Sequence, residues 1–362
     1  MSQPRHARKR HLGSFFAPVA LSHMQGMLST SNHDKGMNNA DESGTERQSM
    51  TPERSEPQFI DDERGGVTTS YGPFMLKSAF QPIFSQSDSG QLTIRAFEAL
   101  IRPFRAGRPV SPGQFFPAVE AEDAHFIDRL CRDLHLRNMG RLGRHSARLF
   151  LNFNPSLYGG KIDFGNEVAG IVALCNELGL SPGRIVCEIT EQGSDEHTLA
   201  DMVAKLRGSR FKIAVDDYGA EESDLHRVDR LRPDVVKLDA AWVRRYSETS
   251  AGRLLLRQLV ERFRERGITS LFEGLEEEFQ VSFCREIGVD LLQGFVLARP
   301  EIFPTSFNIR FPESSEAETP QAPSPTSDVV RQAPPQEPRA EEPRKPEPVQ
   351  PRRTVPFGRR GR

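Results

Sequence analysis

Residues 184–238 read RIVCEITEQGSDEHTLADMVAKLRGSRFKIAVDDYGAEESDLHRVDRLRPDVVKL. Three short β-prone runs lie in this stretch, at Arg184–Ile189, Phe211–Asp216 and Asp234–Leu238. Between the first two, Leu199–Leu206 carries apolar residues at helical spacing. Strands that alternate with helices are typical of α/β proteins, because parallel strands need a crossover connection and a helix usually supplies it.

The same alternation extends outward over a core of residues 73–311. The further β-prone runs are Ser78–Ile83, Ile94–Ile101, Arg148–Asn154, Ile268–Phe272 and Val289–Gln293. The further helix-length segments are Phe126–Leu142, Val168–Leu180, Gly252–Arg266 and Glu277–Ile287. Eight such runs in a core close to the roughly 250 residues of an eight-stranded α/β barrel predict that barrel rather than an open doubly wound sheet.

Both ends of the chain differ from this core. Residues 1–72 lack apolar periodicity, and 12 of the 27 prolines fall within residues 312–362. Such compositions do not bury enough apolar surface to offset the loss of chain entropy. The sequence therefore predicts disordered tails at 1–72 and 312–362, the second one rich in proline.

The overall charge is nearly balanced, with 48 Lys and Arg against 50 Asp and Glu, which argues against a bulk polyanion binder. The basic termini, with Arg352, Arg353 and Arg362 among their residues, leave open a contact with nucleic acid or an anionic membrane surface. No apolar run is long enough to cross a bilayer. Four scattered cysteines without a C-x-x-C pair favour a reducing, cytoplasmic location.

Polar residues gather where the predicted strands end, which is the face of an α/β barrel that carries active sites. They are Glu98, Asn152, Glu188, Asp216, Asp217, Lys237, Asp239, Glu273, Glu276 and Gln293. Any single carboxylate here has the ordinary alternative of capping a helix or pairing with an arginine. Several carboxylates at one mouth need a compensating cation, and hard oxygen ligands select Mg²⁺ or Mn²⁺.

The adjacent pair Asp216 and Asp217 is the most informative feature of this mouth, because one carboxylate can bridge two cations while its neighbour binds the second. Two such metals are the usual apparatus for cleaving a phosphodiester. Lys237 would then lie near the attacking water or the phosphate. Its alternative role is a buried ion pair with Asp239.

At these positions the sequence resembles the EAL-domain family, the cyclic di-GMP-specific phosphodiesterases of bacteria. The signature Glu98-Ala99-Leu100 is followed by Ile101-Arg102 and preceded by Gln81-Pro82-Ile83. The other matching blocks, in the family's order, are Asn152-Phe153-Asn154-Pro155, Glu188-Ile189-Thr190-Glu191, Asp216-Asp217-Tyr218-Gly219, Lys237-Leu238-Asp239, Glu273-Gly274-Leu275-Glu276 and Gln293-Gly294-Phe295.

The resemblance implies a modified (β/α)8 barrel whose first strand is antiparallel to the others, and metal-dependent hydrolysis of cyclic di-GMP to linear pGpG. It implies a first metal held by Glu98, Asn152, Glu188 and Asp216, and a second held by Asp216 and Asp217. It gives Lys237, Glu273 and Gln293 the catalytic, water-positioning roles. It gives the substrate contacts to Gln81, Leu100, Arg102 and Asp239, and it implies a homodimer.

One segment departs from the family pattern, which usually continues Thr-Gly-Tyr-Ser-Ser-Leu after Asp-Asp-Phe-Gly. Residues 218–225 read YGAEESDL, so that Glu221 and Glu222 stand where the family has Gly and Tyr. The charges either point into solvent or weaken metal and substrate binding. The second interpretation keeps open a receptor or interaction module that binds cyclic di-GMP with little or no turnover.

Overall fold

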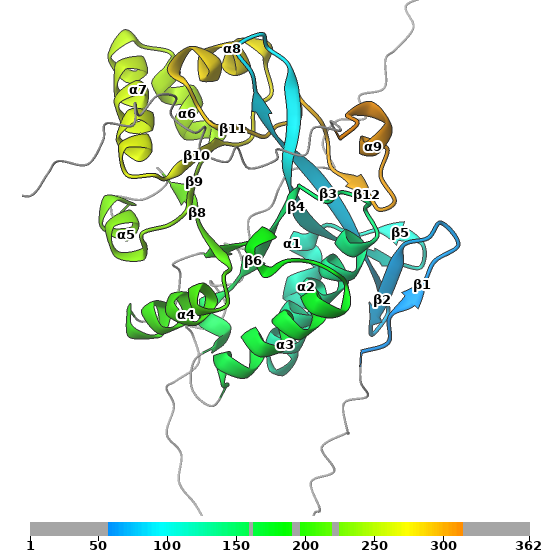
Figure 1. Ribbon diagram of the computed structural model, residues 1–362. Helices are drawn as coiled ribbons and strands as arrows, with labels where there is room; N and C mark the ends of the chain where they lie inside the picture. The colour runs from blue at the N-terminus through cyan, green and yellow to red at the C-terminus, as the bar shows by residue number, and fades with distance from the viewer. Residues whose placement is uncertain (1–56, 159–161, 190–195, 219–223, 314–362) are drawn as a thin grey trace, which may run out of the picture. The chain divides into compact units, whose positions relative to one another are not determined.

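The structure, a computed structural model, describes residues 57–158, 162–189, 196–218 and 224–313 (Figure 1). The strands are β1 (Ile60–Asp61), β2 (Val67–Tyr71), β3 (Phe74–Gln86), β4 (Leu92–Arg105), β5 (Arg108–Pro109), β6 (Arg148–Phe153), β7 (Ile185–Ile189), β8 (Lys212–Tyr218), β9 (Val235–Leu238), β10 (Thr269–Phe272), β11 (Leu291–Leu292) and β12 (Glu301–Ile302).

The α-helices are α1 (Pro112–Phe115), α2 (Ala124–Gly140), α3 (Phe164–Glu177), α4 (Glu196–Gly208), α5 (Asp224–Leu231), α6 (Ala240–Ser247), α7 (Ser250–Glu265), α8 (Glu278–Ile287) and α9 (Phe307–Arg310). Short 3-10 turns are η2 (Phe116–Ala118), η3 (Ala121–Asp123), η4 (Pro155–Tyr158) and η5 (Pro182–Arg184). None of these helices combines the length and the apolar character needed to cross a bilayer, within the residues described.

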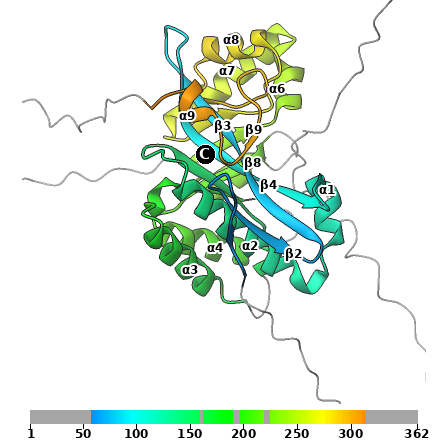
Figure 2. The same cartoon turned by 90° about the vertical axis from the view of Figure 1, so that its right-hand side faces the viewer.

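Eight of the described strands close into a barrel in the order β3-β11-β10-β9-β8-β7-β6-β4, and the pairing of β4 with β3 completes the ring. Strand β3 is antiparallel to both of its neighbours in the ring, whereas the other pairs are parallel. Figure 2 shows β3 and β4 side by side, and their register pairs Gln81 with Glu98. The predicted fold, a modified barrel with one reversed strand, is confirmed.

Each of the eight predicted β-prone runs overlaps a barrel strand, and the five predicted helical segments overlap α2, α3, α4, α7 and α8. In Figures 1 and 2, helices α2, α3 and α4 group on one side of the strands and α6, α7 and α8 on another. Their apolar faces pack on the outside of the barrel, where residues such as Leu206 and Phe263 are fully buried.

The folded region extends further toward the N-terminus than the predicted boundary at residue 73. Strands β1 and β2 precede that boundary, and β2 adds to the edge of β3. Asn138 on α2 holds the backbone of Val67 by accepting from its N–H at 2.8 Å and donating to its carbonyl at 2.9 Å. Thr68 and Thr69 are buried although they are polar, which hid this strand from an apolar pattern. Residues 1–56 and 314–362 of the predicted tails lie outside the described residues.

The barrel interior contains one apolar layer to which every barrel strand contributes one residue. Its members are Ile83, Ala96, Phe150, Val186, Ala214, Val235, Leu271 and Leu291. None of them is more than 7% exposed. A filled interior of this kind is a packed core and not a pore, so chemistry is confined to what lies above it.

Candidate active site

Above the apolar layer lies a second layer, which we call the polar ring. Because side chains alternate along a strand, the residue two positions from each apolar-layer residue points into the same barrel interior. On the mouth side these residues are Gln81, Glu98, Asn152, Glu188, Asp216, Lys237, Glu273 and Gln293. Backbone bonds from Glu273 N–H to the Leu238 carbonyl (3.1 Å) and from Gln293 N–H to the Phe272 carbonyl (2.9 Å) continue the ladder past the ends of β10 and β11.

Lys237 lies at the centre of four carboxylates of the polar ring. Its Nζ is 2.8 Å from Glu188 Oε1 and 3.0 Å from Asp216 Oδ1. It is also 3.0 Å from Glu273 Oε2 and 3.8 Å from Glu98 Oε1. The alternative partner predicted for this lysine, Asp239, instead accepts a bond from the Ala241 N–H at 2.7 Å, where α6 begins. The structure therefore gathers these five ring residues from five different strands.

Burial and neighbouring charges shift the pKa values of Glu188, Glu273 and Lys237. Burial raises the pKa of Glu188 well above its ordinary value, and the charges of Glu98 and Asp216 add to the rise against the opposing charge of Lys237. Burial likewise raises the pKa of Glu273 to about 8. Burial acts to lower the pKa of Lys237, but Asp216, Glu188 and the other carboxylates outweigh it and raise that pKa well above its ordinary value. Burial and the neighbouring carboxylates thus favour the neutral forms of Glu188 and Glu273 unless a further cation compensates their charge.

The donor chemistry of the ring fits a hard divalent cation. No three acidic, histidine or cysteine side chains in the described part of the chain are spaced as a ready metal cage, and Lys237 Nζ lies between the carboxylates instead. Glu188 Oε2 is fully buried, however, and no described group donates a hydrogen bond to it. A buried carboxylate oxygen without a donor is costly unless a cation compensates it.

The predicted ligand pair Asp216–Asp217 lies on an irregularity of β8. The β8–β9 ladder pairs Val215 with Val236 and then Tyr218 with Leu238, so both aspartates stand opposite the single residue Lys237. Such β-bulges re-aim side chains and are frequent next to active sites. The side chain of Asp217 lies outside the described part of the structure, as do Gly219–Ser223 of the predicted loop departure.

Gln293 is fixed by a side-chain bond and by a close backbone approach. Its Nε2 donates to Glu98 Oε2 at 2.6 Å, and its carbonyl accepts from the Leu275 N–H at 3.1 Å. A Cβ on the next residue, Gly294, would lie 2.1 Å from the Leu275 carbonyl oxygen. Only glycine permits this approach, which ties the ends of β10 and β11 together.

Two of the predicted substrate contacts, Leu100 and Arg102, follow the β3–β4 ladder away from the ring. Glu98, Leu100 and Arg102 share one face of β4, because they are two residues apart. Leu100 and Arg102 are half-buried, and Arg102 Nη1 donates to the Ile101 carbonyl at 2.9 Å. Gln81 lies in the ring itself, and Glu276 pairs with Arg244 at 3.6 Å on the exposed surface. Leu100 and Arg102 therefore lie beside the ring, not within it.

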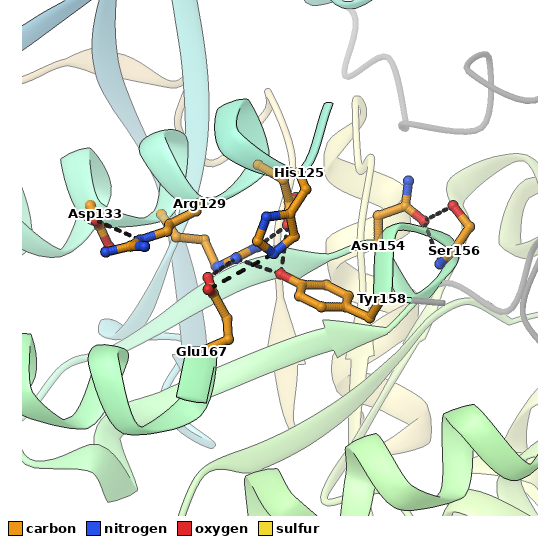
Figure 3. A network of polar contacts seen from close by, with 9 residues as sticks. His125, Arg129, Asp133, Asn154, Ser156, Tyr158 and Glu167 are labelled. Atoms are coloured by element: carbon orange, nitrogen blue, oxygen red, sulfur yellow. Dashed lines mark hydrogen bonds and ion pairs between the residues drawn. The ribbon is translucent and has the colours of Figure 1, made fainter. Parts of the chain in front are cut away.

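A polar network that includes Tyr158 and Glu167 (Figure 3) also contains a buried arginine, whose contacts reach the strand end that carries Asn152. Arg132 of α2 is 2% exposed, and its Nη2 donates to Tyr158 Oη at 2.6 Å and to Glu167 Oε1 at 2.7 Å. Its guanidinium lies over the Phe153 ring at 4.5 Å, and Phe153 directly follows Asn152. Nothing in the sequence distinguished this arginine from the more exposed Arg129 and Arg137 on the same helix.

A second buried arginine, Arg227 of α5, was also missed by the sequence analysis. Its Nη1 donates to the Asp216 carbonyl at 2.9 Å, and its Nη2 donates to the Ile189 carbonyl at 2.7 Å. These partners stand 11 and 38 residues away in the chain. No spacing rule connects them, so only the folded structure reveals the contact.

Comparison with known proteins places these features in a family. The EAL domain model matches residues 75–300. The probable cyclic di-GMP phosphodiesterase PdeA of Escherichia coli is 26% identical over 138 residues, which are 37% of this chain and 19% of PdeA. The cyclic di-GMP phosphodiesterase RocR of Pseudomonas aeruginosa is 30% identical over 166 residues, 45% of this chain and 41% of RocR. The chain thus spans less than half the length of either relative.

Solved structures agree with the fold. Klebsiella pneumoniae BlrP1 in complex with cyclic di-GMP and calcium matches with a TM-score of 0.56 and 28% identity, over 64% of this chain and 56% of that one. Its complex with cyclic di-GMP and manganese matches with a TM-score of 0.56 and 27% identity, over 68% and 59% of the two chains.

Proposed function

Because this chain belongs to the EAL domain family, we propose that it is a phosphodiesterase that hydrolyses cyclic di-GMP to linear pGpG with Mg²⁺ or Mn²⁺. The observation that carries the proposal is the polar ring, in which four carboxylates surround Lys237. Relatives named as cyclic di-GMP phosphodiesterases, and BlrP1 complexes that hold the dinucleotide with calcium or manganese, support the substrate and the need for a divalent cation.

We assign the first metal to Glu98, Asn152, Glu188 and Asp216, and the second to Asp216 and Asp217. When bound, two divalent ions activate a water and stabilise the leaving oxygen of a phosphodiester. The unpartnered oxygen of Glu188 supports this assignment. So does the bulge that sets Asp216 and Asp217 together opposite Lys237.

The chain's own residues would orient the reactants. Lys237, held by its carboxylate partners, would direct an N–H at the attacking water, while Glu273 and Gln293 would fix that water from the neighbouring strands. Arg102 suits a phosphate or a guanine edge, because its planar fork donates two hydrogen bonds at once. Gln81, Leu100 and Asp239 complete the proposed substrate contacts.

The decisive experiment incubates the purified chain with cyclic di-GMP and either Mn²⁺ or Mg²⁺, and follows pGpG by chromatography. We expect pGpG to form with each metal and not after chelation with EDTA. Tight binding of cyclic di-GMP without any turnover would contradict the enzyme and support the alternative, a cyclic di-GMP receptor.

The departure at residues 218–225 is the observation that favours that alternative. Changing Glu221→Gly together with Glu222→Tyr restores the family residues at those positions. A higher turnover rate would show that this loop limits the activity. An unchanged rate would mean that the two acids have no effect on the site.

Three further assignments accompany the proposal. We propose a homodimer, whose test is the mass measured by light scattering.

We propose a cytoplasmic location, which fits four buried cysteines that are all unpaired. We propose that residues 1–56 and 314–362 are tails, and that their basic ends contact anionic surfaces, which salt-dependent binding lost on tail deletion would support.

A further inference from the structure

The backbone of Asp216 leaves the regular sheet hydrogen bonding. Within the described residues, β7 pairs with β8 up to Ile189 opposite Val215, and the β8–β9 ladder shifts register between Val215 and Tyr218. A bulge takes backbone groups out of the ladder, and a buried carbonyl without a donor is unfavourable. The carbonyls of Ile189 and Asp216 stand at this irregularity, where donors from outside the sheet can satisfy them.

Arg227 supplies both of these donors. One guanidinium bridges the two strand ends, with 2.9 Å from Nη1 to the Asp216 carbonyl and 2.7 Å from Nη2 to the Ile189 carbonyl. Its side chain is buried, at 7% exposure, and its neighbours Val228 and Leu231 on α5 are 0% and 2% exposed. The planar fork of arginine can hold two acceptors in fixed directions, and that geometry is not available to lysine.

Both carbonyls belong to the immediate surroundings of the ring carboxylates. Asp216 carries one of them itself, and Ile189 directly follows Glu188, which is fully buried. Each carboxylate lies within 3.0 Å of Lys237 Nζ. A rotation of either peptide would move its carboxylate, so the backbone contact fixes the distance between these two side chains.

We propose that Arg227 is a positioning residue, which holds the ends of β7 and β8 so that Glu188 and Asp216 bind a divalent cation together. The inference rests on the proposed function, because it assigns Arg227 to the metal site of that same reaction. Residues that orient metal ligands from behind typically contribute about 10- to 100-fold to metal affinity. Arg227 acts through backbone carbonyls, which makes its effect independent of any contact with the dinucleotide.

The test compares Arg227→Met and Arg227→Lys with the matched control Arg230→Met, whose arginine lies on the same helix, is 32% exposed and pairs with Glu196 at 2.8 Å. Mn²⁺ alone is titrated into each metal-stripped full-length protein by calorimetry, and circular dichroism checks folding. We expect Arg227→Met to weaken Mn²⁺ binding by about 10- to 100-fold. The lysine of Arg227→Lys can reach only one carbonyl, so we expect its Mn²⁺ affinity to lie between those of Arg227→Met and the wild type. The control Arg230→Met should bind Mn²⁺ with wild-type affinity.

Wild-type Mn²⁺ affinity in a folded Arg227→Met protein would overturn the proposal. If Arg227→Met does not fold, the Mn²⁺ affinity of Arg227→Lys becomes the test. A wild-type Mn²⁺ affinity of Arg227→Lys would then overturn the proposal. A wild-type protein that binds no Mn²⁺ would overturn it as well. A wild-type protein that binds Mn²⁺ but does not hydrolyse cyclic di-GMP would contradict the proposed function and leave the role of Arg227 in metal binding intact.

Discussion

Lys237 Nζ lies 2.8 Å from Glu188 Oε1, and the two side chains are 1% and 0% exposed. A charge pair this deep is not interchangeable with a surface pair, because each partner has given up its hydration and depends on the other. Loss of either partner would leave an uncompensated buried charge, so the pair matters for the stability of the barrel as well as for its proposed chemistry.

Replacing Lys237→Met should lower the free energy of unfolding by about 3–5 kcal/mol, since it leaves several carboxylates buried together without a cation. Urea unfolding in EDTA measures this loss. Adding Mn²⁺ should recover part of it, because a divalent ion replaces the missing positive charge. Lys205→Met is the matched control, because Lys205 on α4 pairs with Asp201 at 2.8 Å but is 39% exposed, and its loss should barely change stability. An equally small effect in both variants would contradict the prediction.

Glu98→Ala and Asp216→Ala should each abolish pGpG formation while the protein stays folded, because each removes a proposed metal ligand and little core volume. The measurement is turnover of cyclic di-GMP with Mn²⁺, with circular dichroism as the check on folding. Glu276→Ala is the control, since Glu276 follows the same strand end as Glu273 but is 61% exposed, and it should keep wild-type turnover. Activity retained in both ligand variants would rule out the two-metal assignment.

Gly294→Ala should destabilise the barrel by about 3 kcal/mol or more and reduce turnover, because its Cβ would meet the Leu275 carbonyl at 2.1 Å and displace Gln293. Gly170→Ala on α3 is the control, since nothing lies within 4 Å of a Cβ there. In a helix interior that change should stabilise by about 1 kcal/mol. Thermal and urea unfolding measure both effects, and a neutral Gly294→Ala would disprove the close approach.

His135 should make the protein lose stability in mild acid. Ser78 Oγ lies 2.8 Å from His135 Nδ1 and accepts from Asn138 Nδ2 at 3.0 Å, so the hydroxyl proton is directed at a neutral imidazole. Burial lowers the pKa of His135 from 6.5 to about 3. The unfolded chain therefore takes up this proton first as the pH falls.

The contribution of His135 to stability is complete above pH 6.5 and is lost progressively between pH 6.5 and about 3. At pH 5 the loss amounts to about 2 kcal/mol. Urea unfolding at pH 7.5 and pH 5 measures it, and His135→Gln should remove this part of the pH dependence. Identical slopes for wild type and His135→Gln would refute the assignment.

The polar ring was predictable from the sequence because it follows from alternation. Glu188 stands two residues after Val186 and Lys237 two residues after Val235, so a reader who places the strands also places these side chains. The short amphipathic helix α5 offered no comparable signal. Arg227 and Arg230 are three residues apart on it, and only tertiary packing decides that the first is buried at 7% exposure and the second is not.

The predicted boundary between the N-terminal tail and the barrel, at residue 73, was wrong because the strand before it is polar. Strand β2 is built largely from Thr68, Thr69 and Ser70, whose hydroxyls do not register as apolar. Thr69 Oγ1 donates to the Gln58 carbonyl at 2.8 Å, so this buried polar group is satisfied by the chain that precedes it. A pattern based on hydrophobicity misses strands of this kind, because hydrogen bonds compensate their burial.

The apolar layer beneath the ring also determines the side from which ligands can reach the ring. With Ile83, Phe150, Leu271 and their five companions filling the barrel, water and ions have no passage from below. A ligand that reaches the ring therefore approaches it from the mouth on the opposite side. A dinucleotide seated over the ring would cover that mouth, so exchange of protons with bulk water would have to wait until the product departs. The proposed turnover would then be ordered by access to the ring as well as by chemistry.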